Sequence, residues 1–476
     1  MKKIIVYISI LSLFTVGCTK TIEQEVPQNS IPASDLAKDP INIRASLNGA
    51  YSSLLSGNYM GLRYWLFADL YTDNIIHVGT FPSFAQFANK NLLADNVEVS
   101  NMWQVIYIAI NRANTTIAAA TENTSPIFTD KASVIAQARA LRAYHYFNLL
   151  RYWGGNENGY NKGNDASGKT WGVPLRLKPT LIEADADPIA RSGEAAIWTQ
   201  ILADLDPATV IANLPTANNR IITQRAANAL RARVQLYREQ WPETEALATS
   251  VITPSPGLTN INFATGGLYT NLYGAVAPTG EVIWTMPFDP TNQNAIAFFY
   301  LPARLGGRNE VSSSTGLRDA HQANDARRII NFTSTTYPAD FPASPDVAAK
   351  TLKYTRVSTG DDFFHHIRLA EVYLIRAEAR ARIGTDLAGA ASDLNVVRTR
   401  AGLPNTTATT QTDLLNAILA ERRVELAHEG HRFFDLRRYN RLDLLVMTTN
   451  SHRVRLPIPQ TELFRSGTIL EKNPGY

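Results

Sequence analysis

The stretch that decides the fold is Ile367-Arg-Leu-Ala-Glu-Val-Tyr-Leu-Ile-Arg-Ala-Glu-Ala379. Its apolar residues recur every three or four positions, which predicts an amphipathic helix with one buried face. Gly384 provides a stop signal, and residues 387–400 repeat the same periodicity before Gly402 ends the second helix. The basic unit of this chain is therefore predicted to be a pair of antiparallel helices.

The same unit recurs elsewhere in the chain. Helical periodicity predicts pairs at 101–152, 198–238 and 366–400, which favours tetratricopeptide-like helical repeats. Residues 254–361 differ, because glycine, proline, asparagine and aromatic residues are dense there and the periodicity fades. Val282-Ile283-Trp284 is one of a few strand-like pieces in this segment. The expected fold is mainly α, a helical repeat scaffold packed against an irregular loop-rich region with a few short strands.

The N-terminus carries a secretory signal. Met1-Lys2-Lys3 precedes an apolar run over 4–16 and then Gly17-Cys18, and Cys18 is the only cysteine. This pattern predicts a lipoprotein signal over 1–17 and lipidation of Cys18, which would anchor the chain to a membrane. The alternative is an ordinary signal peptide with an incidental cysteine. Residues 18–40 are polar and proline-containing and are predicted to be a tether.

The remaining residues, 41–476, are predicted to form one body. The helical scaffold is expected at about 41–253 and 362–476, with the loop-rich insertion at about 254–361. Hydrophobic residues make up 45% of the chain, so a large packed core is expected. The formal charge is +4, and the signal segment contributes half of it, which is too weak and dispersed to indicate nucleic-acid binding.

Seven segments in order resemble the SusD/RagB family of nutrient-binding outer-membrane lipoproteins. The resemblance runs from Cys18 to Tyr476. The segments are RAYHYFNLLRYWGG (142–155), GVPL (172–175), IRLAEVYLIRAEA (367–379), DLNVVRTRAGL (393–403), ERRVELAHEGHRFFDLRR (421–438), LPIP (456–459) and NPGY (473–476). One departure is the polar loop between 154 and 172, where relatives often run almost directly from one segment to the next.

The resemblance implies four tetratricopeptide-like units and a loop-rich ligand-binding part. It also implies a place on the outer face of the outer membrane of a Gram-negative bacterium, attached through the lipid on Cys18. The implied partner is a SusC-like TonB-dependent transporter, over which the lipoprotein acts as a lid. The implied ligand is an oligosaccharide or polysaccharide, with peptides as the alternative. The family is not catalytic and needs no cofactor.

Sugar binding requires aromatic faces for the C–H side of the ring and polar groups for the hydroxyls. Two regions, 59–92 and 269–308, offer both. The predicted ligand-binding residues are Asp73, Asn74, Phe84, Tyr269, Tyr273, Asn292, Tyr300 and Arg304. The first three are preferred, because their polar and turn-forming neighbours indicate an exposed loop. Most large aromatic side chains serve packing, and Trp65 and Trp284 are expected in the core.

The other clusters of charged and histidine residues favour structural roles. Opposite charges at helical spacing over 421–438 predict ion pairs rather than an anion site. His428 and His431 do not follow a zinc-site pattern, so no metal site is predicted, although a structural calcium held by loop carboxylates stays open. The sequence contains no Gly-x-Ser-x-Gly and no phosphate-binding glycine motif. A displayed glycoside hydrolase and a pure protein scaffold are the remaining alternatives.

Overall fold

The computed structural model describes residues 33–253, 257–258, 270–274, 280–286, 288–333, 349–445, 447 and 451–476. The predicted signal segment and Cys18 lie outside these residues. The architecture is mainly helical with a few short strands, as the periodicity predicts. The last part of the predicted tether is helical. It contains helix α3 (Ala33–Leu36), which precedes α4, and Leu36 packs against the core.

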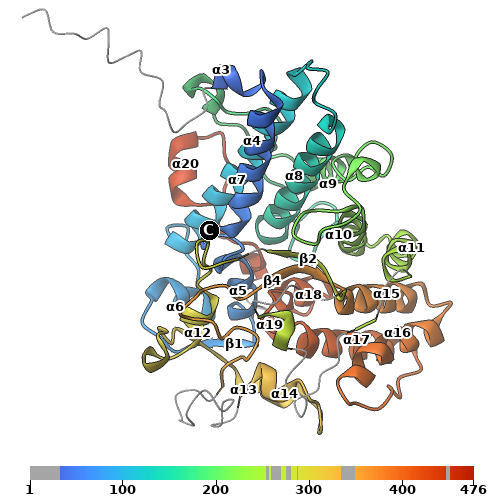
Figure 1. Ribbon diagram of the computed structural model, residues 1–476. Helices are drawn as coiled ribbons and strands as arrows, with labels where there is room; N and C mark the ends of the chain where they lie inside the picture. The colour runs from blue at the N-terminus through green and yellow to red at the C-terminus, as the bar shows by residue number, and fades with distance from the viewer. Residues whose placement is uncertain are drawn as a thin grey trace, which may run out of the picture.

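Long helices form the upper layer in Figure 1. They are α4 (Pro40–Ser52), α7 (Val97–Glu122), α8 (Lys131–Trp153) and α9 (Glu194–Ala203). Their starts follow helix-capping chemistry. The Asp39 carboxylate accepts the Ile41 amide at 2.8 Å, and the Asn96 side chain accepts the Glu98 amide at 2.9 Å. Helices α7 and α8 pack as an antiparallel pair, which confirms the predicted pair over 101–152.

A second helical group follows. It contains α10 (Gln224–Tyr237), α11 (Trp241–Ile252), α15 (Leu369–Ile383), α16 (Leu387–Arg400), α17 (Gln411–Glu425) and α18 (Arg432–Arg438). Helices α15 and α16 form the pair predicted over 366–400. The predicted pairing over 198–238 is wrong. Helix α9 packs on α8, where Trp198 meets Phe147 with ring centroids 6.0 Å apart, and α10 packs on α11 and α15.

Short elements complete the fold. They are α5 (Arg63–Leu70), β1 (Ile75–His77), α6 (Pro82–Ala88), β2 (Val282–Met286), α12 (Ile296–Tyr300), β3 (Val311–Ser313), α13 (Thr315–Ala320), α14 (Arg328–Asn331), β4 (Phe364–Arg368), α19 (Leu442–Leu445) and α20 (Gln460–Ser466). Most of them lie below the long helices in Figure 1, with α20 beside α7. Strand β1 pairs antiparallel with β3, and β2 pairs antiparallel with β4. The strand predicted at 282–284 is confirmed and extends to Met286.

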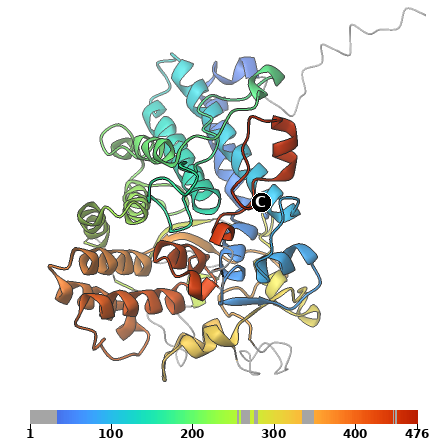
Figure 2. The same ribbon diagram turned by 180° about the vertical axis from the view of Figure 1, so that it is seen from behind.

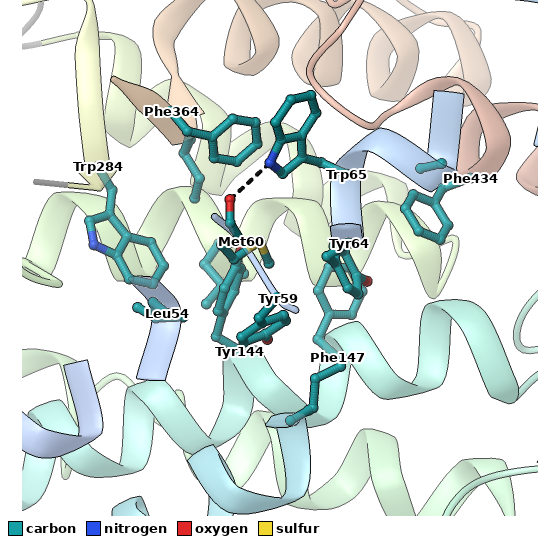
Figure 3. Close-up of a cluster of buried hydrophobic side chains, with 14 of the residues drawn as sticks. Leu54, Tyr59, Met60, Tyr64, Trp65, Tyr144, Phe147, Trp284, Phe364 and Phe434 are labelled. Atoms are coloured by element: carbon teal, nitrogen blue, oxygen red, sulfur yellow. Dashed lines mark hydrogen bonds between the residues drawn. The ribbon is translucent and has the colours of Figure 1, made fainter. Parts of the chain in front are cut away.

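The core lies where the short elements meet the long helices (Figure 3). Trp65 and Trp284 are both buried, as expected for core residues. The indole of Trp65 stacks on Phe364 at 4.8 Å, and its N–H donates to the Met60 carbonyl at 2.8 Å. Trp284 meets Tyr144 of α8 edge to face at 4.9 Å. These aromatic contacts fix the loop-rich layer rigidly on the scaffold.

Candidate functional site

The two regions predicted to carry the ligand meet in space. Strand β1 pairs with β3 in the register Ile75↔Ser313 and His77↔Val311. Helices α6 and α12 lie beside this two-stranded sheet, and both ribbon views show the same grouping (Figures 1 and 2). We call residues 75–84 and 296–313 the β1–β3 junction. The junction joins segments more than 200 residues apart in sequence on one side of the molecule.

The carboxylate of Glu310 holds the junction together. It accepts the backbone amides of Thr80 and Phe81 at 3.0 and 3.2 Å, and it lies 3.1 Å from Nε2 of His77. Burial raises the pKa of Glu310, but the hydrogen bonds from these amides and from Arg308 outweigh it, so the pKa lies below its ordinary value. Glu310 is therefore an ionised group recessed beneath the turn that connects β1 to α6.

Aromatic and cationic groups cover this carboxylate. The guanidinium of Arg308 lies 4.0 Å from the ring centroid of Phe81, while its Nε donates to Glu310 at 3.0 Å. Phe298 is 38% exposed, and its carbonyl accepts the Arg308 amide at 2.7 Å. The surface therefore combines a half-buried ring, an exposed ring and an exposed guanidinium, which are groups suited to a polar ring-shaped ligand.

The preferred residues are less exposed than the sequence predicts. Phe84 is completely buried, and its ring stacks on Phe299 at 5.4 Å and meets Phe67 edge to face at 4.9 Å. Asn74 is also buried, with its side-chain oxygen accepting from Arg423 at 3.0 Å. The expectation of an exposed loop is wrong for both residues, because side chains from distant segments enclose them, Phe299 over Phe84 and Arg423 over Asn74.

Asp73 lies at the edge of the molecule. Its carboxylate is 32% exposed and pairs with Arg432 at 3.0 Å and Arg423 at 2.9 Å. Tyr273 and Tyr300 are buried, with their hydroxyls bonded to Glu429 at 3.0 Å and to His428 Nδ1 at 2.9 Å. These hydrogen bonds hold both tyrosines in the packed interior, so neither ring presents a face to solvent.

Two of the predicted residues lie on the surface. Asn292 sits in an exposed turn that is closed on Asp289, and Arg304 is exposed in the short 3₁₀ turn Ala303–Leu305 just before Arg308. Tyr269 and Cys18 fall outside the described residues. The structure thus brings Arg304 and the buried pair Phe84 and Tyr300 into the junction, but only Arg304 of these three is accessible.

Sequence reasoning missed the accessible rings of the junction. Phe298 is followed directly by Phe299 and Tyr300, and only the first of the three points outward on the short helix α12. The helical rotation of about 100° per residue is a signal that could have separated them, but five residues are too few for the periodicity to be read. Glu310 carried no sequence signal, because its role depends on partners from a distant segment.

A separate hollow lies between α7, residues 174–189 and α20. Its volume is ≈ 520 Å³, and its lining includes Gln104, Tyr107, Arg176, Glu462 and Arg465. The wall is fixed by hydrogen bonds, including Tyr107 to the Pro174 carbonyl at 2.8 Å and Asn111 to the Thr180 carbonyl at 3.1 Å. It contains none of the predicted ligand residues.

The closely spaced charges over 421–438 form ion pairs, as predicted. Arg422 bonds Asp435 at 2.8 Å, and Arg438 bonds Glu378 and Asp435 at 2.8 and 2.9 Å. Each of these side chains is nearly inaccessible, so the group locks helices together and offers no surface to an anion.

Buried histidines add no charge or metal site to this interior. Burial lowers the pKa of His145 and His428 to about 3 and that of His365 to about 4, so all three are neutral near pH 7. Burial also raises the pKa of Asp69 and Asp362 to about 7. Over the part of the chain that the structure describes, no three His, Cys, Asp or Glu side chains gather where they could hold a metal ion.

Sequence models of known families match two parts of this chain. Residues 31–236 match a family described as "Starch-binding associating with outer membrane", and residues 321–450 match the one described as "SusD family". The chain belongs to the SusD/RagB family. SusD-family proteins bind ligands and are not enzymes. None of the helices in the described ranges has the length and apolar character needed to cross a membrane.

Relatives of the SusD/RagB family match nearly the whole chain. The SusD-like protein P2 of Formosa agariphila is 25% identical over 531 residues and covers 100% of both chains. A SusD superfamily protein of Bacteroides vulgatus has a TM-score of 0.78 at 22% identity, covering 92% of this chain and 100% of its own. A structure named "Laminarin binding SusD-like protein" has a TM-score of 0.73 at 23% identity, with coverages of 92% and 100%. These structures share the fold.

Proposed function

We propose that this protein is a cell-surface lipoprotein that binds an oligosaccharide at the β1–β3 junction. In this proposal, Cys18 carries the lipid, and the bound glycan passes to a SusC-like TonB-dependent transporter in the outer membrane. One solved structure is named as a laminarin-binding SusD-like protein, and the family that matches residues 31–236 is described as starch-binding and associating with the outer membrane, and both names support this class of ligand. The mechanism consists of capture and hand-over, with no chemical change of the ligand.

The observation that carries the proposal is the exposure of Phe298 and of Arg308, whose guanidinium stacks on the half-buried Phe81 and is anchored to the buried Glu310. An aromatic face packs against the C–H side of a sugar, and a guanidinium donates to its oxygen atoms. Because Glu310 and the β1–β3 pairing fix the surface in advance, little ordering cost is expected on binding.

The test is calorimetric titration of the mature chain carrying Cys18→Ser with oligosaccharides of plant, microbial and host origin. The expected result is heat with one glycan class, and at least about tenfold weaker binding for Phe298→Ala. Gln104→Ala, which changes the separate hollow, is the control and should bind normally. Heat with mixed peptides alone would establish the peptide alternative instead. Normal glycan binding by Phe298→Ala with loss in Gln104→Ala would move the site to the hollow.

A further inference from the structure

We infer that the glycan bound at the β1–β3 junction carries acid groups, either carboxylates or sulfates, that are recognised by Arg308. This inference rests on the proposed function and names the chemical class of its ligand. Residues 75–84 and 296–313 contain only three charged residues, which are Arg304, Arg308 and Glu310. The positive charges of the two arginines lie at the surface, whereas the negative charge of Glu310 is buried.

The accessible surface of the junction is rich in hydrogen-bond donors. The Arg308 side chain is 40% exposed, whereas that of Glu310 is 1% exposed. Only Nε of Arg308 bonds Glu310, and its two terminal nitrogens have no hydrogen-bond partner among the residues that the structure describes. Four N–H groups with a positive charge therefore remain for a ligand.

Glu310, the one carboxylate within residues 75–84 and 296–313, cannot serve as an acceptor for the ligand. Glu310 already accepts hydrogen bonds from Thr80, Phe81 and Arg308, and it contacts His77. A neutral sugar hydroxyl both donates and accepts, so a site for it normally offers both kinds of group. A carboxylate or a sulfate only accepts, and it matches the donor groups that Arg308 presents.

The guanidinium of Arg308 is held in place before binding. It lies over the ring of Phe81 at 4.0 Å, and its Nε is fixed on Glu310 at 3.0 Å. An arginine that is stacked and anchored in this way loses little side-chain entropy when it forms a bidentate pair with an anion. Phe298, whose carbonyl accepts the Arg308 amide and whose side chain is exposed, supplies an apolar face for the sugar that bears the acid group.

The experiment compares matched pairs of ligands on the mature Cys18→Ser chain. One pair is oligogalacturonate and its carboxyl-reduced form, with further pairs from other uronate glycans. The other arm uses sulfated oligosaccharides and their desulfated forms. Calorimetry should show at least about tenfold tighter binding for the acidic member of one pair. That binding should weaken as the NaCl concentration rises, because the pair is partly exposed to solvent.

Three variants assign the effect to Arg308. Arg308→Gln should remove the preference for the acidic member, and Arg308→Lys should retain only part of it because lysine lacks the planar fork. Arg318→Gln is the matched control, since Arg318 has a similarly exposed side chain (37%) that pairs with Asp319 outside the junction. Unchanged thermal unfolding of all three variants would show that each is folded.

The outcomes separate the inference from the proposed function. Equal affinity for acidic and neutral members, unchanged in Arg308→Gln, would overturn the inference and leave glycan binding in place. An acidic preference that survives Arg308→Gln would also overturn it, because the anion would then be bound elsewhere. Absence of binding to every pair would refute both the inference and the proposed function.

Discussion

Replacement of Phe84 by alanine should lower stability without removing the ligand site. Phe84 is completely buried between Phe67 and Phe299, with ring centroids 4.9 and 5.4 Å away. Truncation of such a ring costs about 3–5 kcal/mol in the free energy of unfolding. An unfolding entropy of about 2.1 cal/mol/K per residue gives about 1 kcal/mol/K for a chain of 476 residues. The midpoint of thermal unfolding should therefore fall by about 3–5 °C.

The matched variant is Phe298→Ala, which removes the same side chain from an exposed position. It should change the unfolding midpoint by less than about 1 °C, because a surface truncation changes stability little. The assay is differential scanning calorimetry of both variants, followed by glycan titration well below their unfolding midpoints. Phe84→Ala should therefore lower the unfolding midpoint and leave glycan binding intact, whereas Phe298→Ala should weaken glycan binding and leave the midpoint nearly unchanged. Loss of binding in Phe84→Ala with an unchanged unfolding midpoint would refute this reasoning.

Three further perturbations test the interior. Arg368→Met removes a buried cation that Glu425 and Glu429 share with other basic side chains, so it leaves excess buried negative charge and should cost about 3–5 kcal/mol by urea unfolding, whereas Arg441→Met, from an exposed pair, should cost under about 1 kcal/mol. The pKa of His428 is lowered to about 3, so its stabilising effect is complete above pH 6.5 and is lost as the pH falls toward 3. His428→Gln should therefore make the free energy of unfolding decline less steeply between pH 6.5 and 4, by up to about 1.4 kcal/mol per pH unit. The measurement is urea unfolding over this pH range, and a slope equal to that of the parent chain would contradict the prediction. Gly430→Ala should unfold at a clearly lower temperature than the parent chain, because Gly430 has φ +75° and a Cβ there would collide with α5. Gly467→Ala is the control: an added Cβ at Gly467 meets no atom within 4 Å, so this variant should unfold at a temperature closer to that of the parent chain.

Much of the scaffold followed from local pattern. The helix pairs over 101–152 and 366–400 were predictable because their apolar periodicity extends over several turns and Gly154 and Gly384 mark helix ends. The partner of α9 was not predictable in the same way. Its apolar face specifies burial but not which neighbour covers it, and the chain order suggested α10 where the fold uses α8.

The sequence predicted ligand-binding residues in two regions, 59–92 and 269–308. The structure places parts of both at the β1–β3 junction, since β1 lies in the first region and α12 in the second, and ligand binding there stays a prediction. Within them, Phe84 and Tyr300 turned inward and Phe298 turned outward. Composition cannot distinguish these rings, because each lies in a short element whose orientation is set by long-range packing.

The sequence by itself determined the family, the helical class of the scaffold and the N-terminal signal that predicts a lipid on Cys18. These properties are encoded locally, through periodicity, helix stops and contiguous motifs. Only the tertiary structure decided which side chains face solvent at the junction. The burial of Glu310 and the exposure of Arg308 depend on a turn more than 200 residues away, whose amides occupy the carboxylate. Long-range hydrogen bonds of this kind leave no periodic trace in the chain, so the exposed surface of the junction is a property of the fold.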